Sequence, residues 1–152
     1  MAPCRAVPAP RTIREIDTIR LLVRAGVIVI CAGGGGIPVV ATTDQAIRGV
    51  EAVVDKDLAA ALLAESLDAN VLLLLTDVTA VWTRWPAANG RPLGRTTPAE
   101  LRSLSFAPGS MGPKVEAACR FVEATAGFAG IGAIEDAEAI LDGRAGTIVT
   151  RA

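Results

Sequence analysis

The hydrophobic residues of this chain gather in short continuous runs, and the stretches between the runs have the mixed pattern of helices. VIVIC at 27–31 and VLLLL at 71–75 predict two buried strands, because a strand covered on both faces is apolar throughout. GFAGIGAI at 127–134 predicts a third strand, and GTIVTR at 146–151 predicts a closing strand. Each of these runs has the length and the composition of a core strand.

The first helix is predicted at residues 12–26, where the apolar residues recur at helical spacing. Thr12, with Glu15 three residues later, fits a capping box, and Gly26 is a suitable stop. Residues 37–55 are expected to form an extended excursion or a hairpin. Residues 81–96 are rich in Pro, Gly and Arg, and we expect an exposed loop there.

Further helices are predicted between the later strands. They are DLAAALLAESL (57–67), TPAELRSL (97–104), KVEAACRFVEATA (114–126) and EDAEAILDG (135–143). Strands that alternate with helices imply an α/β fold, in which helices cover a mostly parallel sheet. We expect one α/β domain at 12–152, preceded by an extended, proline-rich arm at 1–11.

Composition narrows the class of protein. The length of 152 residues suits about one domain, and 51% hydrophobic residues with 3% aromatics indicate an aliphatic core. The net charge of -1 gives no electrostatic reason to bind nucleic acid or an anionic membrane. The uncharged stretch 26–43 approaches the length of a membrane span, but its five glycines and Pro38 oppose a continuous helix. The first residues also lack the apolar region of a signal peptide.

The sequence contains no histidine, which excludes Ser-His-Asp and Cys-His nucleophile systems and most catalytic zinc sites. Any chemistry must therefore use Lys, Arg, carboxylates, hydroxyls and backbone amides. The cysteines, Cys4, Cys31 and Cys119, are widely spaced and form no CxxC pair. They indicate reduced thiols in a cytoplasmic protein.

Lysine is scarce, since the 15 basic residues include only Lys56 and Lys114 as lysines. A solvated cation can be of either type, so chance is one explanation. The other is that both positions require a compact ammonium group rather than a planar guanidinium. Lys114 begins a predicted helix, where a cation opposes the helix dipole. The position is better explained if Lys114 and the helix amides together hold an anion such as a phosphate.

Candidate site residues follow the predicted strands, at the ends where α/β proteins bind ligands. Glycines 33–36 allow close approach of backbone to an anion, although a simple turn explains them equally well. The 55–57 segment, Asp-Lys-Asp, starts a helix. There Asp57 either orients ammonium groups or belongs to an N-cap with solvated neighbours. Asp77 and Val78 either line a nucleotide pocket or form a strand-ending Asx turn.

Four motifs closely resemble the second half of the carbamate kinases, which are members of the amino acid kinase superfamily. They are CAGGGGIPVV (31–40), GVEAVVDKDLAAALLAE (49–65), LLLLTDVTAVW (72–82) and FAPGSMGPKVEAACRFVE (106–123). The motifs keep the order of the family, and the similarity runs from about residue 7 to residue 150. Acetylglutamate and aspartate kinases share the layout but have different sequences in these loops.

The resemblance implies a three-layer αβα sandwich around a mostly parallel sheet, of which this chain is the C-terminal half. It also implies a homodimer. The implied reaction is a reversible phosphoryl transfer between ATP and carbamate that gives ADP and carbamoyl phosphate. Magnesium takes part in this reaction, bound through the nucleotide.

The same resemblance assigns roles to individual residues. Lys114 corresponds to a lysine on the transferred phosphoryl group, Asp57 to the aspartate that organises the active-site lysines, and Lys56 to a lysine near the phosphates. The nucleotide pocket corresponds to Asp77, Val78, Trp82, Gly109, Ser110 and Met111. The backbone close to the reacting groups corresponds to Gly33, Gly34, Gly35 and Gly36.

Carbamate kinases are much longer than this chain, and their first half, which contacts the carbamate, has no counterpart in it. Two other interpretations therefore stay open. The chain is a nucleotide-binding remnant or interaction module without turnover, or an amino acid kinase that acts on another acid, such as acetylglutamate.

Overall fold

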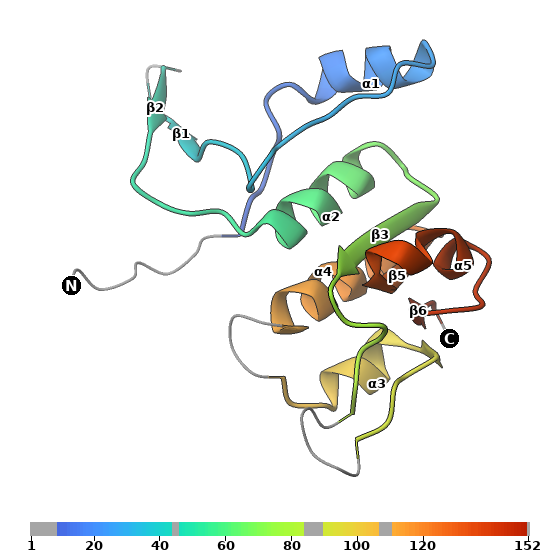
Figure 1. The fold of residues 1–152 in the computed structure, drawn as a ribbon. Coiled ribbons are helices and arrows are strands. Elements are labelled where there is room, and N and C mark those ends of the chain that lie inside the picture. Colours follow the sequence, from blue (N-terminus) through green and yellow to red (C-terminus); the bar gives the residue numbers. More distant parts are fainter. Residues whose placement is uncertain (1–8, 44–45, 84–89, 107–110, 152) are drawn as a thin grey trace.

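The computed structural model describes residues 9–43, 46–83, 90–106 and 111–151 (Figure 1). Helices and strands alternate along most of the chain, as predicted. The elements are α1 (Ile16–Arg24), β1 (Val39–Ala41), β2 (Ile47–Gly49), α2 (Lys56–Ser66), β3 (Val71–Thr76), β4 (Arg95–Thr96), α3 (Pro98–Arg102), α4 (Met111–Ala124), β5 (Phe128–Ala133), the 3-10 turn η1 (Ile134–Asp136), α5 (Ala137–Leu141) and β6 (Thr147–Val149). Residues 9–11 of the predicted arm form no helix or strand, and the rest of the arm lies outside the described residues.

Helix α1 begins later than predicted. Its N-cap residue is Glu15, whose side chain forms no capping hydrogen bond, so the predicted capping box of Thr12 and Glu15 is wrong. The chain leaves the helix at Gly26, which has a φ of 79°. The predicted stop is therefore confirmed. Only Ile19 of α1 is buried, so this helix has little contact with the rest of the described chain.

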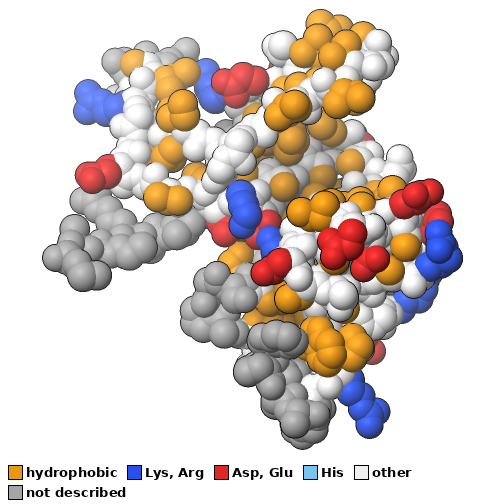
Figure 2. Space-filling model, in the orientation of Figure 1, with side chains coloured by type: hydrophobic (Ala, Val, Ile, Leu, Met, Phe, Trp, Pro, Cys, Tyr) orange, Lys and Arg blue, Asp and Glu red, His pale blue; other side chains and the backbone are white. Residues whose placement is uncertain are grey.

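The predicted strand at 27–31 is wrong. These residues pair with no other described segment, and the side chains of Ile28 and Ile30 are 93% and 97% exposed. A strand requires a neighbour to accept its backbone hydrogen bonds, and the described residues supply none for this run. The hairpin predicted within 37–55 is confirmed, because β1 and β2 pair antiparallel. Figure 2 shows hydrophobic side chains on the surface over α1 and around the hairpin.

The main sheet has four strands in the order β3-β5-β6-β4. β3 is parallel to β5, with Val71 opposite Phe128, and β4 is parallel to β6. β6 is antiparallel to β5, because α5 is short and turns at Gly143 and Gly146 return the chain to the edge at which β5 ends. The predicted α/β fold with a mostly parallel sheet is confirmed, since two of the three strand pairings are parallel and only the β5–β6 pairing is antiparallel.

Helices cover both faces of this sheet. α2 and α4 pack together on one face, and α5 lies on the other. A side chain at Gly130 would come closer than 3.0 Å to Ile140 of α5 and Leu73 of β3. The glycines of GFAGIGAI therefore let α5 lie directly on β5. This arrangement is the three-layer αβα sandwich that the resemblance implied.

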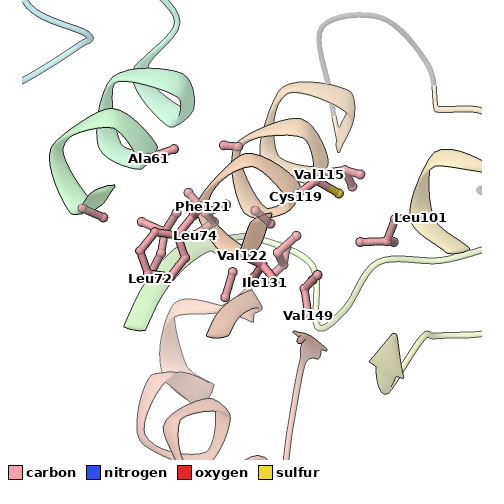
Figure 3. Packing of buried hydrophobic residues seen from close by; sticks show 14 of the residues in the cluster. Ala61, Leu72, Leu74, Leu101, Val115, Cys119, Phe121, Val122, Ile131 and Val149 are labelled. Atoms are coloured by element: carbon pink, nitrogen blue, oxygen red, sulfur yellow. The ribbon is translucent and has the colours of Figure 1, made fainter. Parts of the chain in front are cut away.

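The core lies between the sheet and the α2–α4 layer (Figure 3). Apart from Phe121 it consists of aliphatic and small residues, as the composition predicted. The apolar residues of α4 recur at helical spacing on one side of the helix, and that side faces the core. Each of its four residues is 5% exposed or less: Val115, Ala118, Cys119 and Val122.

Residues 81–96 are less exposed than predicted. Val81 is completely buried, Trp82 forms a bridge with Pro92, and Arg95–Thr96 form β4. The hydroxyl of the buried Thr147 ties this region to β6, because it accepts a hydrogen bond from Val81 N–H and donates one to Leu93 O. The part of the loop at 84–89 lies outside the described residues.

Helix α3 begins at a capping box formed by Thr97 and Glu100, with Pro98 in the first turn. The hydrogen bond from the Thr96 hydroxyl, followed by those from Thr97, lowers the pKa of Glu100. A Thr-x-x-Glu pattern therefore precedes or begins both α1 and α3, but it forms a capping box only at α3.

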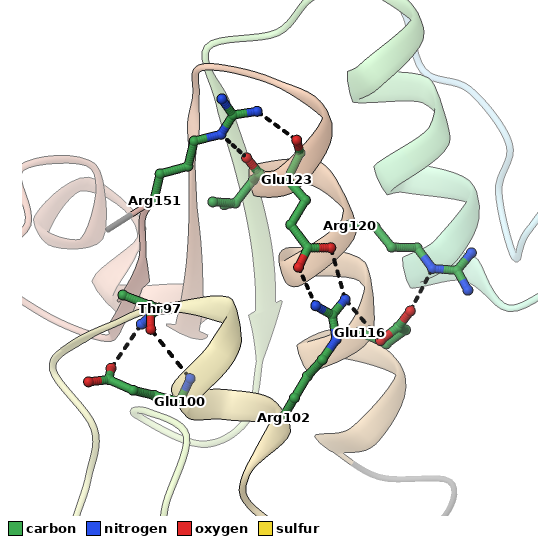
Figure 4. Close-up of polar contacts among 8 residues, drawn as sticks. Thr97, Glu100, Arg102, Glu116, Arg120, Glu123 and Arg151 are labelled. Atoms are coloured by element: carbon green, nitrogen blue, oxygen red, sulfur yellow. Dashed lines mark hydrogen bonds and ion pairs between the residues drawn. The ribbon is translucent and has the colours of Figure 1, made fainter.

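An arginine–glutamate network fastens α3 to α4 (Figure 4). Both terminal nitrogens of Arg102 bond the carboxylate of Glu123, and Arg120 bonds Glu116 one turn earlier on the same helix. Arg151 donates to the carbonyl oxygens of Val122 and Glu123 at the end of α4. The hydrogen bond from Arg102 lowers the pKa of Glu123. This network joins α3 to the exposed side of α4, the helix that carries Lys114.

Candidate functional site

The start of α2 provides the central carboxylate of the site. Asp55 is the N-cap residue, and its Oδ1 accepts hydrogen bonds from the N–H groups of Asp57 and Leu58 at 2.8 and 3.1 Å. Asp55 thus satisfies the first turn of the helix. The side chain of Asp57 has no part in the cap and is available for an ion pair.

Helix α4 brings Lys114 to this carboxylate. The helix begins at Met111 rather than at Lys114, so the lysine lies in the first turn. Lys114 Nζ is 3.0 Å from each carboxylate oxygen of Asp57, and the residues are 8% and 6% exposed respectively. Packing of α2 on α4 makes this contact across 57 positions of sequence.

Lys56 approaches the same carboxylate from the solvent side. Its Nζ lies 3.4 Å from Asp57 Oδ2, and its side chain is 61% exposed. The positions of Lys56 and Lys114 therefore agree with the prediction that Asp57 orients ammonium groups. The two ammonium groups share the carboxylate of Asp57, and with the carboxylate of Asp55 the four side-chain charges sum to zero. Any preference for an anion would therefore come from the partial positive charge of the helix N-termini.

The glycine loop lies beside the start of α2. Gly35 has a φ of 129°, and a Cβ there would come closer than 3.0 Å to the carbonyl oxygen of Val54, directly before the cap. A loop that holds an anion by its backbone needs amides with no other partner. However, Gly33, Gly35 and Gly36 donate to the carbonyl oxygens of Cys31 and Ala32. Gly34 N–H donates to no described residue.

The segment after β3 carries three of the predicted nucleotide-binding residues. Asp77 is exposed and its Oδ1 accepts a hydrogen bond of 3.0 Å from the Thr76 hydroxyl, while Val78 and Trp82 are partly buried. Gly109 and Ser110 lie outside the described residues. Met111 begins α4 and packs against the core.

A pocket of about 370 Å³ lies next to this segment. It is lined by Thr79, Ala80, Pro92, Leu93, Gly94, Asp136, Ala145 and Gly146. Thr147 was not among the predicted site residues, but its hydroxyl holds one wall of this pocket through hydrogen bonds with Val81 and Leu93. Its signal was the one hydroxyl in the apolar run TIV of the closing strand.

These groups share one edge of the sheet. Each of α2 and α4 precedes a strand, β3 or β5, and runs back along it, so both helices begin where those strands end. Lys56, Asp57, Lys114 and Asp77 are therefore all at the carboxyl edge, as predicted for a ligand site. A pocket of about 400 Å³ at the opposite edge, around Asn70 and Arg151, does not belong to this site.

No group of three or more Cys, Asp or Glu side chains is placed to hold a metal ion among the residues that the structure describes. Within the same residues, no helix is both long and apolar enough to cross a membrane.

Comparison with known proteins decides the family. The sequence profile of the amino acid kinase family matches residues 3–127. The chain belongs to the amino acid kinase family. Within this family, it is 48% identical over 147 residues to the carbamate kinase of Rhizobium meliloti, and 46% identical over 144 residues to that of Haemophilus influenzae. Each alignment covers 95% of this chain, but only 45% and 46% of the relatives. This amino acid kinase chain thus spans about half the length of the relatives it matches.

Solved structures agree with this assignment. The carbamate kinase from Giardia lamblia bound to AMP-PNP superposes with a TM-score of 0.93 at 39% identity, covering 96% of this chain and 52% of that one. The N-acetylglutamate synthase from Neisseria gonorrhoeae superposes with a TM-score of 0.67 at 20% identity. The second likeness shows the amino acid kinase fold alone.

Proposed function

We propose that this chain supplies the ATP/ADP-binding half of a carbamate kinase-type phosphotransferase. The reaction is the reversible transfer of a phosphoryl group between ATP and carbamate, giving ADP and carbamoyl phosphate. The observation that carries the proposal is the carboxylate of Asp57, which holds Lys114 at 3.0 Å and Lys56 at 3.4 Å. The identity of 46–48% to carbamate kinases supports the choice of reaction.

In this proposal the two lysines have separate roles. Lys114 is buried and fixed by both oxygens of Asp57, so its ammonium group is positioned before the substrate arrives. It would stabilise negative charge on the oxygens of the phosphoryl group during transfer. Lys56 is exposed and able to move, and would contact the other phosphates. Asp57 is a positioning residue for both lysines.

The nucleotide would lie along the segment 77–82 and beside residues 109–111. A carbamate kinase of similar structure was solved with bound AMP-PNP, which supports nucleotide binding on this scaffold. We propose that magnesium is carried on the phosphate oxygens of ATP or ADP rather than by a protein cluster. The glycine loop at 33–36 would bring backbone close to the reacting groups, with Gly34 N–H as a donor.

The presence of only two lysines makes the site accessible to a direct test. In a chain labelled with ¹⁵Nζ-lysine, spectra of the side-chain ammonium groups contain one signal for each lysine. We expect both signals to shift on addition of magnesium-ADP, with Lys114→Met removing one of them. Adenosine should leave both unchanged, because it has no phosphate. If the chain is folded and its lysine signals do not shift when magnesium-ADP is added, the proposal is contradicted.

Turnover requires a separate test. ATP formation from ADP and carbamoyl phosphate is measured for the chain alone and with the part of the Rhizobium meliloti enzyme that it does not match. Lys114→Ala should abolish any ATP formation. A Lys114→Ala chain that is as active as the parent would refute the role given to this lysine.

The half-length match favours one alternative, a nucleotide-binding module without turnover. This alternative predicts the same lysine shifts with magnesium-ADP and no ATP formation under either condition. A carboxylate acceptor other than carbamate is supported only by likeness of fold. The cytoplasmic location and the homodimer implied by the resemblance stay predictions.

A further inference from the structure

The side chain of Thr147 on β6 is completely buried, and its hydroxyl joins two segments that lie outside its own strand. Segments 81–83 and 91–93 lie antiparallel, and Leu93 N–H donates to Val81 O at 2.7 Å. In a regular antiparallel pair, Val81 N–H would return a hydrogen bond to Leu93 O. Here the Thr147 hydroxyl takes the place of that bond, because it accepts from Val81 N–H at 2.9 Å and donates to Leu93 O at 2.6 Å.

This hydroxyl lies behind the pocket of about 370 Å³ beside the segment that follows β3. The volume lies within the range of small-molecule sites, which starts at roughly 300 Å³. The pocket is lined by residues of three segments, 79–80, 92–94 and 145–146, and by Asp136. Val81 follows the first segment, Leu93 lies in the second and Thr147 follows the third. The separation of the first two walls therefore depends on the Thr147 hydroxyl.

The strand itself does not require a threonine at position 147. Valine has nearly the same shape and suits a buried strand equally well, whereas a buried hydroxyl must find hydrogen-bond partners to offset its loss of water. Both partners of Thr147 belong to segments that form the pocket. With valine at this position, Val81 N–H and Leu93 O would either stay unpaired or bond each other directly, which would draw the two walls together.

We infer that Thr147 is a positioning residue for the nucleotide, because its hydroxyl sets the separation of segments 79–81 and 92–94. It thereby sets the affinity for the part of the nucleotide beyond the phosphates. The inference rests on the proposed function, in which Lys56 and Lys114 hold the phosphates and the rest of the nucleotide lies along 77–82. The Thr147 side chain is 0% exposed, so it acts through the walls of the pocket and not by contact with the ligand.

The test compares magnesium-ADP with magnesium-pyrophosphate, which has the phosphates of ADP without its ribose and base. The Kd of each ligand for the full chain is measured from the ¹⁵N signals of the lysine side chains. Thr147→Val removes the hydroxyl and Thr147→Ser keeps it. The matched control is Thr125→Val, just after α4. The Thr125 hydroxyl also joins a donor and an acceptor, Gly127 N–H and Phe121 O, but at the opposite edge of the sheet.

We expect Thr147→Val to raise the Kd for magnesium-ADP about tenfold, equal to about 1.4 kcal/mol, and to change that for magnesium-pyrophosphate less than about twofold. Thr147→Ser should bind both ligands like the parent chain. Thr125→Val should also bind both like the parent, although it too loses hydrogen bonds. In the parent chain, the amide signals of Val81 and Leu93 should shift with magnesium-ADP and not with magnesium-pyrophosphate. This last measurement tests the inference without any substitution.

Three results would overturn the inference while leaving the proposed function standing, provided that the lysine signals of the parent shift with magnesium-ADP. The first is a folded Thr147→Val chain that binds magnesium-ADP as tightly as the parent. The second is an equal loss of affinity for both ligands, which would give Thr147 a general structural role. The third is a parent chain in which magnesium-ADP shifts the amide signals of Val81 and Leu93 no more than magnesium-pyrophosphate does. A folded parent chain whose lysine signals shift with neither ligand would overturn both the inference and the proposed function.

Discussion

Lys114 Nζ is equidistant from the two carboxylate oxygens of Asp57, at 3.0 Å from each, and both side chains are only about one-tenth exposed. The pair joins the first turns of α2 and α4, which come from distant parts of the sequence. A buried ion pair of this kind contributes little net stability but is costly to break on one side. Stability measurements can therefore detect it without any assay of activity.

The first prediction concerns this pair. Lys114→Met leaves the Asp57 carboxylate buried with only the exposed Lys56 nearby, and should lower the free energy of unfolding by about 3–5 kcal/mol. Lys114→Met combined with Asp57→Leu should recover much of this loss. Urea denaturation measures both. Lys56→Met is the control, and should cost less than about 1 kcal/mol because that lysine is largely solvated. A larger effect of Lys56→Met than of Lys114→Met would contradict the geometry.

The second prediction compares two neighbouring glycines. Gly35→Ala places a Cβ against the carbonyl oxygen of Val54 at a φ of 129°, whereas Gly34→Ala meets nothing within 4 Å. Gly35→Ala should therefore cost about 1–3 kcal/mol and displace the Asp55 cap. The Asp55 carboxylate accepts hydrogen bonds from the N–H groups of Asp57 and Leu58, so faster amide exchange at these two residues would report the displacement. Equal exchange in the two variants would show that the loop does not hold the cap.

The third prediction concerns pH and the contact between α3 and α4. The hydrogen bond from Arg102 lowers the pKa of Glu123 below its ordinary 4.5 in the folded chain. The stabilisation from this pair is therefore present above pH 4.5 and is lost as the pH falls through the lower folded value. Glu123→Gln should flatten this part of the curve of stability against pH, and Glu138→Gln on α5 should not. If the stability of Glu123→Gln and of the parent chain fell equally as the pH dropped below 4.5, the role given to the Arg102–Glu123 pair would be contradicted.

The fourth prediction concerns Cys119. Burial raises the pKa of its thiol to about 11 from an ordinary 9.0. In a Cys4→Ser, Cys31→Ser chain at pH 8, Cys119 should react with a thiol reagent at least about 100-fold more slowly than after unfolding, because its thiol is held neutral and is also completely buried. The folded chain keeps this thiol neutral, so stability should fall as the pH rises from 9.0 towards 11. Rapid labelling of the native chain would show that the core at α4 is open.

Local sequence patterns predicted most elements correctly where the neighbours of an element lie within the described chain. The VLLLL run forms β3 because β5 pairs with it, and α4 buries the face that its spacing indicated. The equally apolar VIVIC run forms no strand, because no described strand pairs with it. The hydrophobicity of a segment shows that it is suited to burial, and the tertiary structure decides whether a neighbouring element buries it.

The candidate site shows the same limit. The scarcity of lysine pointed to Lys56 and Lys114, and both lie at Asp57. The sequence could not show that Asp55 is the N-cap and that Asp57 pairs with Lys114, because either aspartate suits an N-cap. The amides of the glycine loop were also misjudged, since hydrogen bonds inside a turn depend on positive φ values that many Gly-rich sequences permit.

The position of β6 has a consequence for the order in which the chain can fold during synthesis. β4 joins the sheet only through β6, which is the last strand along the chain, and Arg151 just after it holds the end of α4. The ribosome makes β4 well before the strand that joins it to the sheet, whereas β3, β5 and α4 pack on one another without β6. A nascent chain that ends before residue 147 should therefore leave β4 unpaired, and only the synthesis of β6 lets β4 join the sheet.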